Sequence, residues 1–277
     1  MNQEPGSTSV ASEAVSSRID TSVPHPARRY DYWLGGKDNF AADRESGDAI
    51  AAAFPAIRTA VQENRAFLRR AVTFLSEQAG IRQFLDLGTG LPTANNTHEV
   101  AQAIAPESRI VYVDNDPLVL VHARALLTSS PQGSTAYLDA DLRDTDKILG
   151  DPEVRETLDF SSPVGLMLVA ILHFLPDDAD PYGIVARLVG AMPSGSYLVM
   201  THATGDFWTP EMRAALASGR LGRLSPRTRD EFTRFFGGLE LVSPGVVSIA
   251  EWRAESEPEP RPTAADSYAY GAVARIP

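Results

Sequence analysis

The chain contains no cysteine among its 277 residues. This absence excludes disulfide bonds, thiolate metal sites and cysteine nucleophiles. Histidine is also scarce, with five in the whole chain, and we find no histidine paired with a carboxylate at the spacing of a metal-binding motif. We therefore expect no metal site in this protein.

Long apolar segments are missing as well. The longest runs from Val164 to Leu175, which is too short to span a bilayer and instead predicts a buried strand. Residues 1–23 are rich in Ser, Ala, Glu and Thr and lack the apolar centre of a signal peptide. We therefore expect a soluble cytoplasmic protein whose first 23 residues form a disordered tail.

Positive charge is in deficit, because 25 Lys and Arg residues face 36 Asp and Glu residues, for a net charge of −11. A chain this acidic neutralises phosphates poorly, so we expect neither nucleic acid nor membrane as a partner. One segment departs from this average and indicates either solvated helix faces or a docking face for an anionic acceptor. Its arginines are Arg213, Arg220, Arg223, Arg227, Arg229 and Arg234.

A glycine motif follows the first clear apolar strand of the sequence. Residues 84–90 read Phe-Leu-Asp-Leu-Gly-Thr-Gly, and a second apolar run, 110–113, ends at Asp114. This pattern predicts two adjacent parallel strands whose carboxyl ends hold a nucleoside, with Gly88 and Gly90 allowing the ligand close to the backbone. Asp114 is placed to accept hydrogen bonds from a ribose diol.

An alternative role for Asp114 is that of a helix N-cap. Asp116 is the better candidate for that role, because Pro117 follows it at the first helical position. We therefore favour Asp114 as a ribose ligand.

The residues around the glycines also indicate the kind of nucleoside. Pro92 and Thr93 do not fit the glycine fingerprint of a dinucleotide site, whose helix begins at the second glycine. The carboxylate of Asp86 would repel phosphates but suits a ligand that carries an ammonium and a sulfonium group. The sequence therefore predicts S-adenosylmethionine as the cofactor.

At this point the chain resembles a known group of enzymes. Residues 86–90, Asp114 and the pair Asp141-Leu142 are similar to motifs of class I S-adenosylmethionine-dependent methyltransferases. More narrowly, the chain resembles an actinobacterial methyltransferase-like family of unknown substrate, over about residues 24–277. The stretches that carry this second resemblance are 29–44, 90–93, 98–102 and 111–117.

The resemblance implies a set of cofactor-binding residues. It implies that Asp141 accepts a hydrogen bond from the adenine amino group while Leu142 packs near the ring. Asp141 can also be read as a turn acid at the surface, and Asp139 replaces it if the register is displaced by two residues. The full set is Asp86, Gly88, Thr89, Gly90, Asp114, Asn115, Asp141 and Leu142.

The fold class expected is α/β, a Rossmann-like methyltransferase fold with a mainly parallel seven-stranded sheet and helices on both faces. Alternation of apolar strands with helical stretches supports this class. The strands are expected at 82–87, 109–114, 134–139, 164–172, 195–202, 239–249 and 268–276, and the helices at 46–54, 57–79, 96–105, 117–128, 144–158 and 180–192.

We divide the chain into four parts. A disordered tail at 1–23 precedes an N-terminal helical cap or lid at 24–80. The cofactor-binding domain comprises 81–205 and 238–277, and a helical insertion at 206–237 interrupts it before the last two strands.

Two histidines end predicted strands near the expected site. His173 and His202 could each act as a general base toward the acceptor. The alternative is that each is a packing residue with its ring nitrogens satisfied by the backbone.

The segment from Tyr30 to Arg44 is unusually polar for a simple cap. Aromatic and charged residues surround a Gly-Gly turn at 35–36, so we expect this segment to close over the cofactor as a lid. The alternative is a purely structural cap on the sheet. The residues expected near the ligand are Tyr30, Asp31, Lys37, Asp38 and Asn39.

These observations predict an enzyme that transfers a methyl group from S-adenosylmethionine to an unidentified small-molecule nucleophile. Two alternatives stay open at the level of sequence. One is a protein that binds S-adenosylmethionine or S-adenosylhomocysteine without turnover, because a fold and a pocket do not establish chemistry. The other is an NAD(P)-dependent oxidoreductase, which Asp86, Pro92 and Thr93 disfavour.

Overall fold

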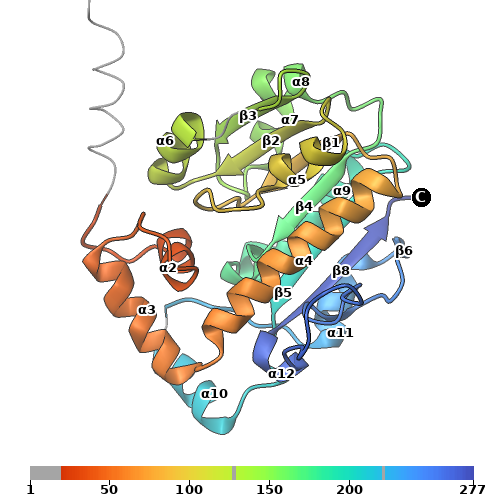
Figure 1. Ribbon diagram of the computed structural model, residues 1–277. Helices are drawn as coiled ribbons and strands as arrows, with labels where there is room; N and C mark the ends of the chain where they lie inside the picture. The colour runs from red at the N-terminus through yellow and green to blue at the C-terminus, as the bar shows by residue number, and fades with distance from the viewer. Residues whose placement is uncertain (1–19, 127–128, 220–221) are drawn as a thin grey trace, which may run out of the picture.

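The computed structural model describes residues 20–126, 129–219 and 222–277. Its centre is an eight-stranded mixed sheet with the strand order β3-β2-β1-β4-β5-β8-β6, and β7 also pairs with β8 (Figure 1). Five neighbouring strands are parallel. They are β1 (Gln83–Leu87), β2 (Arg109–Asp114), β3 (Ser134–Asp139), β4 (Gly165–Val169) and β5 (Tyr197–Ala203).

The sheet differs from the prediction in its antiparallel part. β8 (Ala269–Arg275) is antiparallel to β5, and two short strands, β6 (Glu240–Leu241) and β7 (Val247–Ser248), pair with β8. The single strand expected at 239–249 is divided because Gly245 N–H donates to the Val242 carbonyl in a turn through Pro244, which has no N–H for a strand ladder. The expected seven strands are therefore eight.

Alternate residues of the strands face opposite helical layers, as the two-residue period of a strand requires. Phe84 and Tyr112 pack toward α4 (Ile57–Glu77) and α5 (Thr97–Ile104), whereas Leu85 and Val111 pack toward the other face. The described elements of that other face include α7 (Thr145–Gly150), α8 (Pro152–Thr157), α9 (Pro181–Gly190), α11 (Arg229–Thr233) and the turn η3 (Arg234–Phe236).

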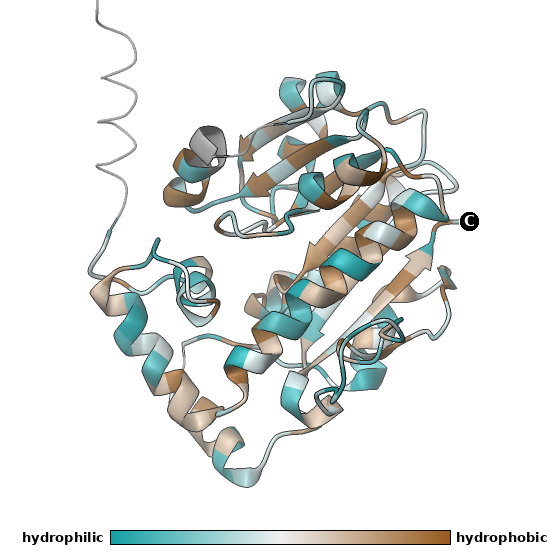
Figure 2. Cartoon of the chain, in the orientation of Figure 1, coloured by the Kyte–Doolittle hydropathy of each residue, from teal (hydrophilic) through white to brown (hydrophobic). Residues whose placement is uncertain are grey.

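α4 is the longest described helix and crosses one face of the sheet (Figure 1). Its buried side includes the apolar residues that the sequence placed on one face, among them Phe67, Ala71 and Leu75. Figure 2 shows hydrophilic residues on the outward side of this helix and mostly hydrophobic residues in the strands beneath it. Burial of this face fixes the helix on the sheet.

The predicted cap at 24–80 contains α4, which packs on the sheet, and two helices before it, α2 (Pro26–Trp33) and α3 (Ala41–Ala53). From here on, the cap means α2 and α3. These helices lie beyond the carboxyl ends of the parallel strands (Figure 1). α3 meets α10 (Pro210–Ala217) of the insertion, because Ile50 and Phe54 share an apolar cluster with Trp208 and Met212. The cap and the insertion therefore meet over one end of the sheet.

Two predicted elements end earlier than expected. The helix expected at 144–158 is two helices, because Asp151 caps a new helix at Glu153 N–H and Pro152 occupies its first position. The strand expected at 164–172 ends at Val169, since Ala170 adopts a positive φ of 57°.

The first part of the expected disordered tail, residues 1–19, lies outside the described residues.

None of the described helices is long and apolar enough to cross a membrane. The remaining described elements connect these layers. They are α6 (Pro117–Leu126), η1 (Leu172–Phe174), η2 (Asp177–Ala179) and α12 (Ala264–Ser267).

Candidate cofactor and acceptor site

A cavity of about 790 Å³ lies between the carboxyl ends of the parallel strands and the N-terminal cap. Its volume falls in the range of roughly 300–1,000 Å³ that is usual for small-molecule sites. One end is lined by the predicted cofactor residues Asp86, Gly88, Thr89, Gly90, Asp114, Asn115, Asp141 and Leu142. The other end is lined by residues of the cap and the insertion, including Trp33, Ile50, Phe54, Trp208 and Tyr268.

The glycine loop after β1 needs both of its glycines. Gly88 has a φ of +74° and Gly90 a φ of +69°, a region that disfavours side chains. A Cβ atom at Gly88 would also lie 2.5 Å from Cγ1 of Ile171, which packs directly against the loop. The loop is therefore closed on one side by Ile171 and open on the cavity side.

Asp114 supports this loop from the end of β2. Its Oδ2 accepts a hydrogen bond from Gly90 N–H at 2.8 Å, and its Oδ1 accepts one from Asp116 N–H at 2.9 Å. The side chain is 9% exposed, and burial raises its pKa above the ordinary value. The cap of α6 is Asp116, which accepts from Leu118 N–H at 2.9 Å. Asp114 is therefore free of the capping role.

Asp86 is more deeply buried and lies on the α4 side of β1. Its Oδ2 accepts a hydrogen bond from the Thr97 hydroxyl at 2.6 Å. Burial raises the pKa of Asp86 to about 6, and this burial outweighs the opposing effects of the Thr97 hydrogen bond and the positive charge of Arg65. Thr89 stabilises the turn after β1, because its hydroxyl donates a hydrogen bond to the Asp86 carbonyl at 3.1 Å.

Two hydrogen-bonding groups of residues in the cavity wall have no partner in the part of the chain that the structure describes. They are Nε of Arg65, on α4, and the hydroxyl of Thr93, and both are buried and belong to cavity-lining residues. Nη2 of Arg65 meanwhile donates to the Ala94 carbonyl at 3.0 Å and to the Asn95 carbonyl at 2.8 Å. Arg65 was not predicted from the sequence, because its place depends on how α4 meets the loop after β1.

Asp141 lines the cavity two residues beyond β3, while Asp139 ends that strand. The Asp141 carboxylate accepts from Nε and Nη2 of Arg143 at 2.9 and 2.6 Å, and these side-chain hydrogen bonds lower its pKa to about 2. Asn115 and Leu142 lie in the same part of the cavity wall. The register of β3 therefore places Asp141, rather than Asp139, at the cavity.

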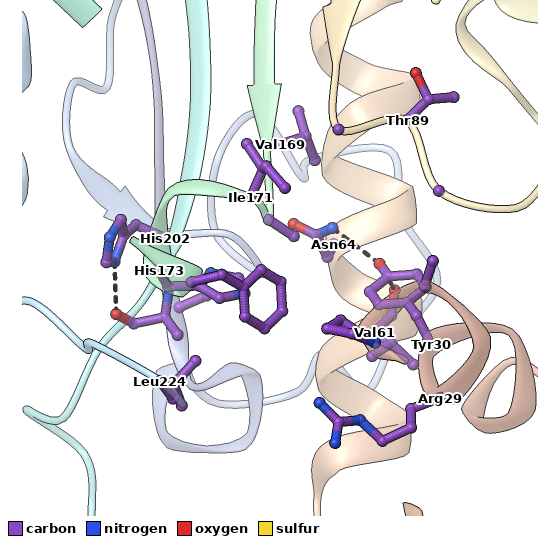
Figure 3. Close-up of a pocket in the computed structure, with 18 of the residues that line it drawn as sticks. Arg29, Tyr30, Val61, Asn64, Thr89, Val169, Ile171, His173, His202 and Leu224 are labelled. Atoms are coloured by element: carbon purple, nitrogen blue, oxygen red, sulfur yellow. Dashed lines mark hydrogen bonds between the residues drawn. The ribbon is translucent and has the colours of Figure 1, made fainter. Parts of the chain in front are cut away.

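The two predicted histidines line the cavity together (Figure 3). Nδ1 of His202 faces the Ala203 carbonyl at 2.8 Å and must carry the proton, because a carbonyl only accepts. Its Nε2 then accepts from Nη1 of Arg227 at 2.9 Å. Burial lowers the pKa of His202 to about 4. With both nitrogens engaged, His202 has no lone pair available to act as a base.

His173 has a related arrangement. Its Nδ1 accepts a hydrogen bond from Ala203 N–H at 3.4 Å, which assigns the proton of the neutral ring to Nε2. Burial lowers its pKa well below the ordinary value. In this arrangement, His173 can donate a hydrogen bond into the cavity more readily than it can remove a proton.

A hydrogen-bonded chain joins the cap to the sheet at the middle of the cavity. The hydroxyl of Tyr30 donates to the Val61 carbonyl at 3.1 Å and accepts from Nδ2 of Asn64 at 2.9 Å (Figure 3). Oδ1 of Asn64 accepts from the Thr201 hydroxyl at 2.7 Å. Asn64 was missed in the sequence, although a polar residue three positions after Val61 on the apolar face of α4 was the available signal.

Part of the predicted lid lies elsewhere. Tyr30 and Asp31 line the cavity, but Lys37, Asp38 and Asn39 lie outside its wall. Oδ2 of Asp31 accepts from Asp38 N–H at 2.9 Å and from Nδ2 of Asn39 at 2.8 Å, so these polar groups satisfy one another around the Gly-Gly turn. Two of the five predicted lid residues therefore line the cavity, and an approach of the other three to the ligand stays a prediction.

The group of arginines in the insertion is mainly structural. Arg227 is 4% exposed and binds Asp177 and His202, while Arg229 donates to the Val246 carbonyl. Arg213 donates to the Gly205 carbonyl, and Arg223 lines the cavity. Arg220 lies outside the described residues.

Comparison with known proteins agrees with this geometry. The fold is that of a class I methyltransferase. The chain matches the S-adenosyl methyltransferase family model over residues 12–277 and belongs to that family. It is an S-adenosylmethionine-dependent methyltransferase, and S-adenosylmethionine is its cofactor.

Two solved structures are similar to the whole chain. A DUF574 family protein from Streptomyces avermitilis is 48% identical, with a TM-score of 0.88, and the match covers 94% of this chain and 100% of that one. A methyltransferase candidate from Thermobifida fusca is 43% identical, with a TM-score of 0.84 and coverage of 93% and 96%. No curated protein matches. The resemblance to an actinobacterial methyltransferase-like family is confirmed.

Proposed function

We propose that this enzyme transfers the methyl group of S-adenosylmethionine to a small organic molecule that binds in the apolar end of the cavity. The observation that carries the proposal is the continuity of one cavity. It runs from the nucleoside end at Asp114 to the aromatic end at Phe54 and Trp208. A donor and an acceptor bound at the two ends would meet between them, beside Tyr30 and Asn64.

The residues at the first end fit each part of the cofactor. Asp114 would accept hydrogen bonds from the ribose hydroxyls, and Asp86 would pair with the ammonium group. The unused Nε of Arg65 and hydroxyl of Thr93 would bind the carboxylate. The positive φ values of Gly88 and Gly90 leave the space in which the backbone approaches the ligand.

Adenine would lie at the third strand. Asp141 accepts from its exocyclic amino group and Leu142 packs against the ring in this proposal, with Asn115 beside them. The short hydrogen bonds from Arg143 hold the Asp141 carboxylate in place at the rim of the cavity. The side chains that bind adenine, ribose and the amino-acid part thus come from successive segments at one edge of the sheet.

The bound cofactor supplies an electrophilic methyl group on a positively charged sulfur, so the chain itself contributes binding, orientation and the exclusion of water. His173 is proposed to orient the acceptor through its Nε2–H. His202 and Arg227 hold the wall of the cavity behind it, since Ala203 links the two rings through its N–H and its carbonyl.

The size of the cavity and the charge of the chain together favour a small acceptor. The cap and the insertion cover the apolar end, and the net charge of −11 opposes a polyanion. We therefore propose a small molecule rather than a nucleic acid as the acceptor, in the cytoplasm.

A transfer assay tests this function. The enzyme is incubated with S-adenosylmethionine carrying a labelled methyl group and an extract of actinobacterial cells, because both similar structures come from such organisms. Label should enter the small-molecule fraction and depend on Asp114. Label in the macromolecular fraction would contradict the proposal, and binding without any transfer would favour a cofactor-binding protein.

A further inference from the structure

One buried arginine of the cavity has no role in the cofactor site. Arg29, on α2, lines the cavity and is 9% exposed. Its Nη1 donates to the Ser46 hydroxyl at 3.1 Å, while its Nε is buried without a partner in the described residues. Figure 3 shows its guanidinium group turned into the cavity on the side of Leu224.

Arg29 forms no ion pair within the described part of the chain, although the charge of Asp43 acts on it from farther away. Among those residues, no carboxylate oxygen lies within 4.0 Å of its guanidinium nitrogens, whereas neighbouring Arg28 contacts both Asp43 and Asp116. Burial lowers the pKa of Arg29 because the surroundings disfavour its charge. Burial outweighs the favourable charge of Asp43, so this arginine without a direct ion pair is costly, and an anionic ligand would offset that cost.

The position of Arg29 separates it from the cofactor end. Its neighbours are Ser46 on α3 and the backbone at Gly222, where a Cβ atom would lie 3.7 Å from its Nη1. Thr89 of the glycine loop lies on the opposite side of the cavity in Figure 3. The cofactor end already contains a second cavity-lining arginine, Arg65. An anion at Arg29 therefore belongs to the acceptor.

The walls near Arg29 describe the rest of that molecule. The rings of Phe54 and Trp208 meet edge to face with centroids 5.0 Å apart, and Tyr268 contacts Phe54 in the same way at 5.6 Å. Trp33 and Ile50 complete this apolar wall. Arg223 also lines the cavity beside Gly222 but is exposed, whereas Arg29 is buried, so beside these apolar side chains the buried guanidinium group offsets one negative charge.

We propose that Arg29 binds the carboxylate of the methyl acceptor, and that the acceptor is a small carboxylic acid with an aromatic or aliphatic body. This inference rests on the proposed function, since it places the acceptor at the second end of the same cavity. Arg29 holds the acid group, and the aromatic wall of Phe54, Trp208 and Tyr268 holds the body.

The test measures binding to protein that is saturated with S-adenosylhomocysteine. The probes are benzoate, phenylacetate and 3-phenylpropionate, each compared by calorimetry with its primary amide, together with phenyl phosphate. At least one acid should bind roughly tenfold or more tightly than its amide, as expected for a charge-assisted hydrogen bond. This preference should disappear in Arg29→Gln. The preference should persist in the control variant Arg58→Gln. This substitution removes an equal positive charge from α4, where Nη1 of Arg58 donates to the Tyr32 and Trp33 carbonyls.

Several outcomes would overturn the inference. They are an absence of preference for every acid over its amide, a preference that survives in Arg29→Gln, and tighter binding of phenyl phosphate than of the acids. If Arg29→Gln weakens S-adenosylhomocysteine but not 5′-methylthioadenosine, which lacks the amino-acid part, Arg29 binds the cofactor instead. If Arg29→Gln does not fold, Arg29→Lys should keep a reduced preference, and an unchanged preference would contradict the role.

The same experiment separates this inference from the proposed function. If wild-type protein does not bind S-adenosylhomocysteine, the proposed function fails. If it binds the cofactor product but shows no preference for acids, only the carboxylate inference fails.

Discussion

At the scale of single residues, two buried carboxylates dominate the cofactor end of the cavity. Asp86 lies within β1, and Asp114 is the last residue of the adjacent strand β2. Burial raises the pKa of both carboxyl groups. The protein without ligand therefore keeps two acids in surroundings that disfavour their charge. A bound ammonium group and ribose hydroxyls would relieve that cost, which explains why a binding site accepts such residues.

Asp86 should make folding stability depend on pH. Because its pKa is about 6 in the folded protein and about 3.9 in an unfolded chain, the folded state binds the extra proton between these values. Asp86 should therefore lower the free energy of unfolding as pH rises from about 4 to 6, whereas His173 and His202, whose pKa values are lowered by burial, should raise it over the same range. Asp86→Asn should remove the Asp86 contribution, so that the free energy of unfolding falls less or rises more between about pH 4 and 6, and it should stabilise the free protein at pH 7 by roughly 1–3 kcal/mol, measured by urea unfolding.

The control for this prediction is Asp146→Asn, at an exposed carboxylate on α7. It should leave the slope unchanged. An Asp86→Asn variant that is less stable than wild type at pH 7 would show that the Asp86 charge contributes favourably to the free protein.

Asp114 should matter mainly for cofactor binding. Asp114→Ala removes the acceptor of the ribose hydroxyls and should weaken S-adenosylhomocysteine by roughly tenfold to a thousandfold in calorimetry. A modest loss of stability should accompany this, because Gly90 and Asp116 lose a hydrogen-bond acceptor. Asp139→Asn is a matched control, since Asp139 pairs with Asp114 across the sheet but lies outside the cavity wall. Equal affinities for all three proteins would argue against the ribose role.

At the scale of elements, the cap is the part that joins the two ends of the cavity. Tyr30 is hydrogen-bonded to α4, and His25 contacts Asp116 at 2.9 Å, next to the ribose ligand proposed above. The cap is therefore mechanically connected to the loop that follows β2. A ligand that orders this loop should also order α2 and the turn after it.

Hydrogen exchange tests that connection. The amides of residues 30–44 should exchange more slowly when S-adenosylhomocysteine is bound, by at least about tenfold if the cofactor adds 1.4 kcal/mol or more to local stability. The amides of α9, on the other face of the sheet, should change less. Exchange across 30–44 that ignores the cofactor would reduce the segment to a structural cap.

The elements that the sequence predicted well are those with strong local periodicity. β2 and β3 have the predicted bounds, and Asn96 begins α5 with Glu99 accepting from its N–H at 2.8 Å. The weaker predictions concern elements defined by partners far away in the chain. β6 and β7 exist because each finds a short stretch of β8, and no local pattern announces such pairing.

The candidate site shows the same division. Asp86, Gly88 and Asp114 were found because strand ends and glycines fix them locally. Arg29 and Arg65 were missed, because their roles depend on how α2 and α4 pack over the glycine loop. Charge alone does not distinguish Arg65 from the exposed Arg58 of α4, or Arg29 from its neighbour Arg28, which contacts Asp43 and Asp116.

At the scale of the whole molecule, we propose that one cavity holds two ligands, with the cofactor at one end and the acceptor at the other. The family model covers residues 12–277 and therefore includes the cap, the sheet and the insertion that together form the cavity. The walls that we propose for the acceptor come from the parts outside the parallel strands. Variation in those parts would change the acceptor while the cofactor end stays the same.

The most direct test of the central claim compares ligands on the wild-type protein. Calorimetry and thermal unfolding are carried out with S-adenosylmethionine, S-adenosylhomocysteine, NAD and NADP. Both adenosyl ligands should bind at one site and, at a hundredfold excess over the dissociation constant, stabilise the fold by about 2.7 kcal/mol, whereas the dinucleotides should have no effect. Stabilisation by NAD or NADP without any by S-adenosylmethionine would contradict the assignment of the cavity.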